Sequence, residues 1–164
     1  MNFLVWRHAD AAPGEPDELR PLTPLGIQQA QYIGAWIKKN VPGPYRVFGS
    51  SALRASQTAS FFGEHYDPID DFGYMKDTAT GSAVLKHANW PLADITTIFV
   101  GHQPTVGRIN SILHSDIEKD TNMEGGSVWW FTSDHDNKNR LAMLKAVISA
   151  NGDSTINTSF CRVE

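Results

Sequence analysis

The chain has 164 residues, a formal net charge of −4 and an apolar fraction of 41%, which is an ordinary composition for a globular protein. This charge provides no overall positive field for nucleic acid or for an anionic membrane surface, so we expect neither as a partner. No apolar run approaches the roughly 20 residues of a membrane span, and the first residues lack the basic start of a signal peptide. The sequence therefore predicts a cytoplasmic protein with a single domain over residues 1–164.

The first predicted strand is the short apolar run at residues 3–6, and the first predicted helix covers residues 24–39. Thr23 is the expected N-cap of this helix, and Pro24 suits its first turn. Apolar residues recur in the helix at a spacing close to 3.6 residues, which predicts that they face the core. These residues are Ile27, Ala30, Ile33 or Gly34, and Ile37.

A second strand and helix follow in the same order. Residues 46–49 form the expected strand, and a helix begins directly after it. We expect Ser50 and Ser51 to cap this helix, because serine side chains accept hydrogen bonds from backbone N–H groups of a first turn. The apolar side of the helix is expected to contain Ala55, Ala59 and Phe62.

The middle of the chain contains a loop-rich stretch at residues 67–81, with a short strand near Ile69. A weak helix is expected at residues 82–87, followed by a strand over the β-branched run at 95–100. The turn at residues 101–104 then leads into another helix. Its inward-facing residues are expected to be Val106, Ile109 and Leu113.

The last part of the chain predicts an antiparallel hairpin. Its strands are expected at residues 127–132 and 141–149, around a polar loop at 134–140. Three consecutive aromatic residues lie in the first of these strands, Trp129, Trp130 and Phe131. We expect them to pack in the core and along the sheet edge, although such a run can also form a binding platform.

Strands and helices that alternate along a chain favour a mainly parallel sheet covered by helices on both faces. The predicted fold class is therefore α/β: a three-layer α/β/α sandwich with a mainly parallel central sheet and an antiparallel C-terminal part. Ligands of such folds bind beyond the carboxyl ends of the strands, where the following helices begin.

Histidine and arginine residues follow three of the predicted strands at this edge. Arg7 and His8 come directly after the first strand, Arg54 follows the second, and His102 follows the strand at 95–100. The carboxyl ends of parallel strands meet at one edge of a sheet, so these side chains should converge. Arg20, just upstream of the first helix, can reach the same edge.

This combination of side chains suits phosphate chemistry. Arginines offer planar, bidentate donors for phosphate oxygens, and backbone N–H groups at helix starts favour anions. A neutral imidazole can attack phosphorus and split a difficult displacement into two easier steps. The residues therefore predict a phosphate pocket made of Arg7, Arg20, Arg54 and His102, with either His8 or His102 as the nucleophile.

Four short motifs in this order resemble those of the histidine phosphatase superfamily, also called the phosphoglycerate mutase-like family. They are Leu4-Val5-Trp6-Arg7-His8-Ala9, Leu22-Thr23-Pro24-Leu25-Gly26, the run from Ser50 to Ala59, and Val100-Gly101-His102. The short length and the run Arg20-Pro21-Leu22-Thr23 are most similar to the SixA-type phosphohistidine phosphatases. The resemblance covers about residues 3–107 and is only general beyond them.

The resemblance implies a role for each matching residue. His8 would accept the phosphoryl group, Arg7 and Arg54 would grip its oxygens with help from Arg20, and His102 would stabilise its charge. No metal or organic cofactor is implied, and the single cysteine, Cys161, cannot form a cysteine-based metal site. One position departs from the family pattern, because Ala9 stands where glycine is usual.

The residue that would protonate a leaving group is less evident. Gln103 follows His102, whereas acid phosphatases of this family have an aspartate there. Asp77 is the best placed candidate by its position in the chain, although a solvated loop charge is the more usual role for such a residue. General acid help contributes roughly 10²–10⁴-fold to rate, and the labile P–N bond of phosphohistidine depends on it less than a phosphate ester does.

We therefore expect a phosphohistidine phosphatase that acts on a phosphorylated protein and releases inorganic phosphate. Two alternatives remain open from the sequence. One is a phosphatase or mutase for small phosphate esters, although the sequence offers little room for a lid that would exclude water. The other is a phosphate-binding regulatory module without catalytic activity.

Overall fold

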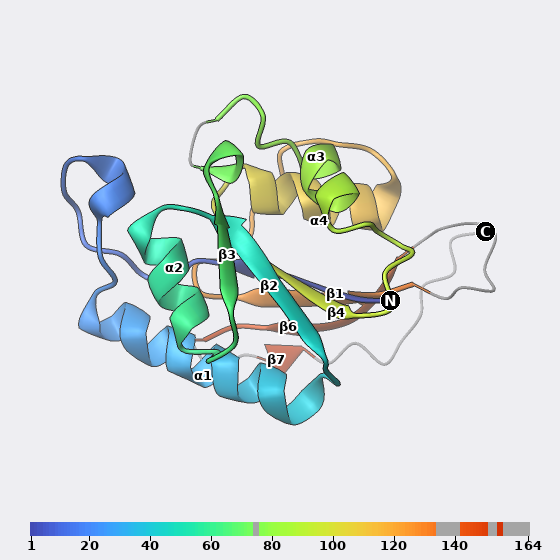
Figure 1. The fold of residues 1–164 in the computed structure, drawn as a ribbon, viewed down its shortest axis with the longest axis horizontal. Coiled ribbons are helices and arrows are strands. Elements are labelled where there is room, and N and C mark those ends of the chain that lie inside the picture. The colour runs from blue at the N-terminus through green and yellow to red at the C-terminus, as the bar shows by residue number, and fades with distance from the viewer. Residues whose placement is uncertain (74–75, 134–141, 151–153, 156–164) are drawn as a thin grey trace.

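The structure is a computed structural model that describes residues 1–73, 76–133, 142–150 and 154–155. A central sheet runs through the molecule, with strands in the order β3-β2-β4-β1-β5-β6-β7 (Figure 1). The strands are β1 (Asn2–Arg7), β2 (Tyr45–Ser50), β3 (Tyr66–Ile69), β4 (Thr96–Gly101), β5 (Val128–Thr132), β6 (Met143–Ile148) and β7 (Ser154–Thr155). The helices are α1 (Pro24–Asn40), α2 (Leu53–Ser60), α3 (Gly81–His87) and α4 (Thr105–Ser115), with short 3-10 turns η1 (Asp17–Leu19) and η2 (Asp70–Phe72).

The sheet has a parallel part and an antiparallel part. Strands β3, β2, β4 and β1 pair in parallel, whereas β5, β6 and β7 continue the sheet in antiparallel pairs. This arrangement confirms the predicted mixed sheet and the predicted C-terminal hairpin. It also brings the ends of β1 and β4 together, because Arg7 pairs with Gly101.

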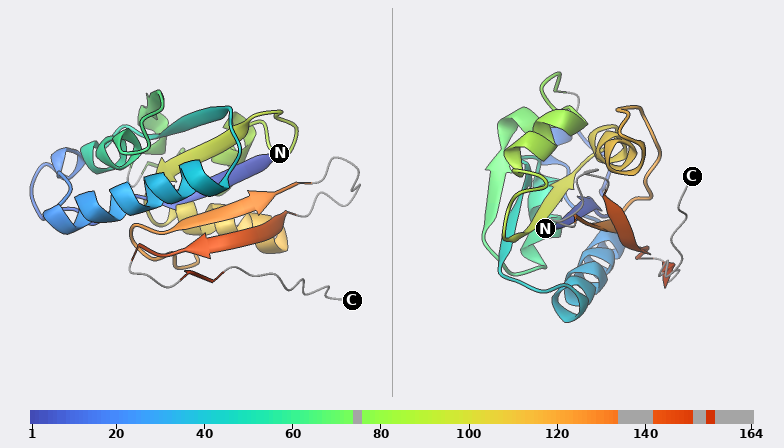
Figure 2. Two further views of the ribbon diagram at one scale, coloured as in Figure 1. Left: turned by 90° about the horizontal axis from the view of Figure 1, so that it is seen from below. Right: turned by 90° about the vertical axis from the view of Figure 1, so that its right-hand side faces the viewer.

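Helices cover both faces of the sheet. Figure 2 shows α1 on one side and α3 with α4 on the other. Side chains of β1 alternate between two apolar cores: Leu4 and Trp6 pack with α1 and α2, while Phe3 and Val5 pack with α3 and α4. Full burial of such side chains stabilises by about 1.5–3 kcal/mol each. The two cores confirm the predicted three-layer sandwich.

Helix α1 begins where the sequence predicts, and Ala30, Ile33 and Ile37 are buried as expected, whereas Ile27 is not. Thr23 caps the helix, since its Oγ1 accepts a hydrogen bond from the N–H of Gly26 at 3.0 Å. A Cβ at Gly26 would lie 2.0 Å from the carbonyl oxygen of Asp10, so only glycine permits this approach. The close contact places Gly26 and Gln29 on the buried face. Ile27, which we expected to face the core, is 38% exposed.

The prediction that Ser50 and Ser51 cap α2 is wrong. The N-cap is Ala52, and no side chain makes a capping hydrogen bond there. Parallel pairing with β3 carries β2 through Ser50, which is fully buried. Ser50 is consequently the last residue of the strand, and its Oγ accepts a hydrogen bond from the N–H of Ala52 at 3.2 Å.

The aromatic run of β5 packs within the fold, as we expected. Phe131 is fully buried in the core beneath α3 and α4. Trp130 meets the Trp36 ring at 6.4 Å on the other face, and its indole N–H donates to Oδ1 of Asn2 at 3.0 Å. Trp129 is partly buried against the core that contains Phe131.

Some predictions fall on residues outside the described part of the chain. They include the polar loop at 134–140 and Cys161. Within the described residues, no helix combines the length and apolar character needed to cross a bilayer.

Candidate active site

Two histidines meet at the carboxyl ends of β1 and β4. The backbone N–H of His8 donates to the carbonyl of Gly101 at 3.0 Å, which continues the pairing of these strands past their last residues. The imidazole rings of His8 and His102 lie 4.9 Å apart between centroids and are tilted by 57°. The adjacent parallel strands therefore bring together two side chains that are far apart in the sequence.

The ring of His8 is held in a defined orientation. Its Nδ1 lies 2.7 Å from the carbonyl oxygen of Ala9. A carbonyl can only accept, so Nδ1 carries the hydrogen and Nε2 keeps its lone pair. Burial and the charges of Arg54, Arg7 and Arg20 outweigh the raising effect of the Ala9 carbonyl and lower the pKa of His8 to about 4. At neutral pH the ring is thus an uncharged nitrogen nucleophile.

His102 is almost completely enclosed, with 3% of its surface exposed. Its Nε2 lies 2.7 Å from the Oγ of Ser50, the last residue of β2. Burial, followed by the charges of His8 and Arg54, lowers the pKa of His102 to about 2. Both rings are therefore neutral in the protein without a bound anion.

These lowered pKa values predict a pH dependence of stability. Below the ordinary histidine pKa of 6.5, the unfolded chain takes up protons that the folded site does not. Stability is therefore expected to fall as the pH decreases from about 6.5 to about 4, with His8 alone contributing on the order of 3 kcal/mol. Urea unfolding across this range measures the effect, and His8→Asn should flatten the slope. An unchanged slope in that variant would contradict the assignment.

Ser50 is a site residue whose contact with His102 the sequence analysis missed. Its Oγ fixes the Nε2 of His102, and its carbonyl accepts from the Tyr66 hydroxyl at 2.6 Å. Removing a hydrogen-bond partner from a buried polar group costs about 1–3 kcal/mol. We expect Ser50→Ala to slow phosphoenzyme formation about tenfold in single-turnover measurements. The exposed neighbour offers a matched control, because Ser51→Ala should leave the rate unchanged, and equal rates for both variants would remove Ser50 from the site.

Two of the predicted arginines meet on Asp17 of η1. Arg54 is 2% exposed, and its Nη1 and Nη2 donate to the carbonyl and to Oδ2 of Asp17 at 2.6 and 2.8 Å. Arg20 donates from Nη1 to Oδ1 of Asp17 at 2.9 Å and from Nε to the Ala12 carbonyl at 2.7 Å. Sequence reasoning missed Asp17, although an acid three residues before Arg20 was a visible signal.

The carboxyl group of Asp17 is ionised at neutral pH. Partial burial by itself would raise its pKa, but the hydrogen bonds and charges of Arg20 and Arg54 outweigh burial and hold the pKa below its usual value. An acid with a lowered pKa is a poor proton donor.

The other predicted residues make contacts outside the histidine pair or lie apart from it. The Nη1 of Arg7 donates to the carbonyl of Met123. Asp77 is exposed in the segment before α3, and no hydrogen bond or ion pair found among the described residues joins it to the two histidines. Ala9, at the usual glycine position, is fully buried, so the core between the sheet and helices α1 and α2 accommodates its methyl group.

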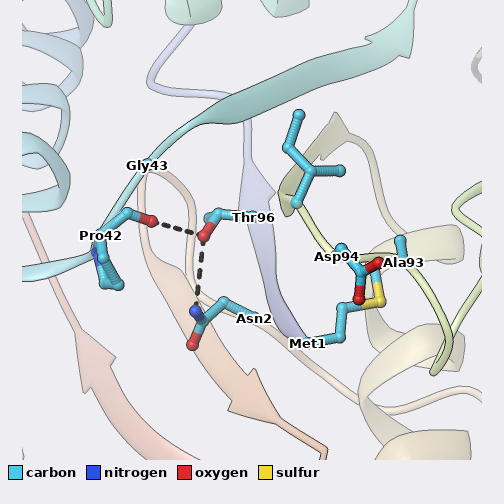
Figure 3. Close-up of a pocket in the computed structure, with 8 residues that line it drawn as sticks. Met1, Asn2, Pro42, Gly43, Ala93, Asp94 and Thr96 are labelled. Atoms are coloured by element: carbon cyan, nitrogen blue, oxygen red, sulfur yellow. Dashed lines mark hydrogen bonds between the residues drawn. The ribbon is translucent and has the colours of Figure 1, made fainter.

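A pocket lies at the opposite end of the sheet, where β1 and β4 begin (Figure 3). Asn2 and Thr96 line it, and the amide of Asn2 donates to Oγ1 of Thr96 at 3.4 Å. It shares no residue with the histidine pair. The described residues also contain no group of three or more His, Cys, Asp or Glu side chains that could hold a metal ion.

Comparisons with known proteins found similar sequences and similar folds. No family model matches the chain. The uncharacterized protein Rv1276c of Mycobacterium tuberculosis is 35% identical over 115 residues, which cover 66% of this chain and 70% of the relative. The protein histidine phosphatase SixA, solved with tungstate, superposes with a TM-score of 0.74 at 22% identity, over 92% of this chain and 98% of that one. A Nakamurella multipartitia structure assigned to SixA has a TM-score of 0.66 at 25% identity, over 90% and 94% of the two chains.

The structural neighbours are phosphatases, which supports a hydrolase. The fold is that of the histidine phosphatase superfamily, and SixA phosphohistidine phosphatases are among the structural neighbours of the chain.

Proposed function

We propose that this protein is a SixA-like phosphohistidine phosphatase, which removes phosphate from a histidine of a phosphorylated protein in the cytoplasm. In this proposal residues 1–164 act as one domain, His8 is the nucleophile, and Arg7, Arg54 and His102 surround the transferred group. Arg20 assists them. The proposal draws on the histidine pair and on the likeness to SixA, whose structure contains tungstate.

The proposal of phosphohistidine as the substrate is based on the charge state of Asp17. This carboxylate contacts Arg54 and Arg20, and its pKa is lowered, so it is ionised and unsuited to protonate a leaving alkoxide. An imidazole leaving group depends less on such help, because solvent can protonate its nitrogen. The site therefore suits a P–N bond better than the P–O bond of an alkyl ester, and Asp77 remains only a weak candidate acid.

The proposed reaction has two displacements at phosphorus. In the first, Nε2 of His8 forms a bond to phosphorus while the P–N bond of the substrate breaks, and the substrate imidazole takes a proton from water. In the second, water forms a P–O bond while the bond to His8 breaks; this releases phosphate, restores the neutral ring and returns a proton from the attacking water to the solvent. The transferred group is negative in both steps, so fixed arginine charges stabilise it.

A comparison of leaving groups tests the proposal. Turnover of a phosphohistidine-bearing protein domain and of an alkyl phosphate monoester would be measured with the same enzyme preparation. We expect kcat/KM for phosphohistidine to be higher by about 10²-fold or more, the lower bound of general acid assistance. A strong preference for the ester would reject the proposed substrate in favour of a small-ester phosphatase.

A further inference from the structure

The donors that would grip a phosphate are already engaged inside the protein. Asp17 presents two carboxylate oxygens and its backbone carbonyl to the guanidinium groups of Arg54 and Arg20, at distances between 2.6 and 2.9 Å. Arg54 is nearly inaccessible to solvent, and the Asp17 side chain is 35% exposed. Asp17 therefore lies between the buried arginine and the outside of the molecule.

A carboxylate and a phosphate compete for the same donors. The carboxylate is planar and the phosphate is tetrahedral, but each accepts two parallel N–H hydrogen bonds from a guanidinium group. Two anions at hydrogen-bond distance from one guanidinium repel each other strongly where solvent is partly excluded. A phosphate that binds Arg54 must consequently displace the Asp17 carboxylate or tolerate its charge nearby.

The turn that carries Asp17 is tethered at its base and loosely packed at its tip. The base is held by the pairing of Ala11 with Leu22 and by the hydrogen bond from the Ala12 N–H to the Pro21 carbonyl at 2.8 Å. No residue of η1 is buried, and Leu19 is 61% exposed. Figure 1 shows this turn projecting beyond α2. Movement of η1 would therefore expose little apolar surface that is now buried.

From these contacts we propose that Asp17 is an internal competitor of phosphate, which holds Arg54 and Arg20 in the free protein and weakens the binding of released phosphate. The proposal rests on the proposed function, because it assumes that these arginines receive the phosphoryl group. In this role Asp17 favours release of the product. A phosphoryl group delivered by a protein domain is bound with additional contacts, whereas free phosphate must displace Asp17 unaided.

Phosphate affinity of charge-removing variants tests this role. Asp17→Asn keeps the shape of the side chain and removes its charge, and Glu18→Gln removes the same charge from the exposed next residue of the same turn. Titration calorimetry with inorganic phosphate at fixed ionic strength gives the dissociation constant of each variant. We expect Asp17→Asn to bind phosphate about tenfold more tightly than the unaltered protein, and Glu18→Gln to bind it equally well.

Every other result overturns the proposal. Unchanged or weaker phosphate binding by Asp17→Asn would mean that the carboxylate only holds the arginines in position. An equal gain in phosphate affinity in Glu18→Gln would mean that the effect comes from net charge and not from Asp17. Asp17→Ala, with thermal unfolding as a folding control, repeats the test without an amide. Failure of the proposed function is separate, because it would appear as phosphate binding without any phosphorylation of His8.

Discussion

Replacement of His8 by alanine is expected to lower phosphohistidine turnover by at least about 10⁴-fold. Removal of a nucleophile forces water to attack directly, and comparable losses are typical of covalent catalysts. The neutral Nε2 of this partly buried ring is the nitrogen that the Ala9 carbonyl leaves available to attack. Release of inorganic phosphate from a phosphohistidine-bearing domain, under saturating and limiting substrate, measures both kcat and kcat/KM.

Two controls separate chemistry from folding in this experiment. His65 is a surface histidine with 87% of its side chain exposed, and His65→Ala should retain full activity. The His8→Ala protein should still bind phosphate, because the arginines remain. Turnover of His8→Ala within tenfold of the unaltered protein would exclude His8 as the nucleophile.

Replacement of Arg54 by methionine is expected to have the second largest effect, a loss of roughly 10²–10³-fold in kcat. Fixed donors aimed at developing charge contribute on this scale when one is removed. Arg54 is 2% exposed at the start of α2, so its charge acts where little water screens it. Methionine fills a similar volume without charge, and single-turnover kinetics would place the loss in the phosphoryl transfer step.

Two further variants separate the charge of Arg54 from its geometry and control for the loss of a surface arginine. Arg54→Lys retains a charge but not the planar fork, so it should recover only a small part of the rate. Arg108 forms a surface ion pair with Asp120 at 2.6 Å, and Arg108→Met should be fully active. An Arg54→Met protein that folds normally and loses less than tenfold would contradict a role in phosphoryl transfer.

Much of the fold could be predicted because local signals and topology agreed. The buried run of β1 and the capped start of α1 at Thr23 are strong local patterns, and both are observed. Parallel strands with intervening helices bring their carboxyl ends to one edge, which is why His8 and His102 meet from distant positions. Convergence at a sheet edge depends on strand order and direction, and alternating elements already restrict both.

Contacts that depend on close packing could not be predicted from the sequence. Ser50 follows the pattern of a helix cap, and only the extension of β2 by pairing with β3 directs its hydroxyl to His102. Ile27 fits the helical period, yet the approach of Gly26 to Asp10 rotates it outward. Asp17 lies in an irregular segment, where no periodicity predicts the direction of a side chain.

Mapping the phosphoryl group trapped during turnover tests the central claim most directly. The protein would be quenched under alkaline conditions that preserve phosphohistidine, digested, and examined by mass spectrometry and by phosphorus NMR. We predict a single modified residue, His8, with phosphorus bonded to Nε2. A phosphoryl group on His102, attachment through Nδ1, or steady turnover with no label on His8 would contradict the account.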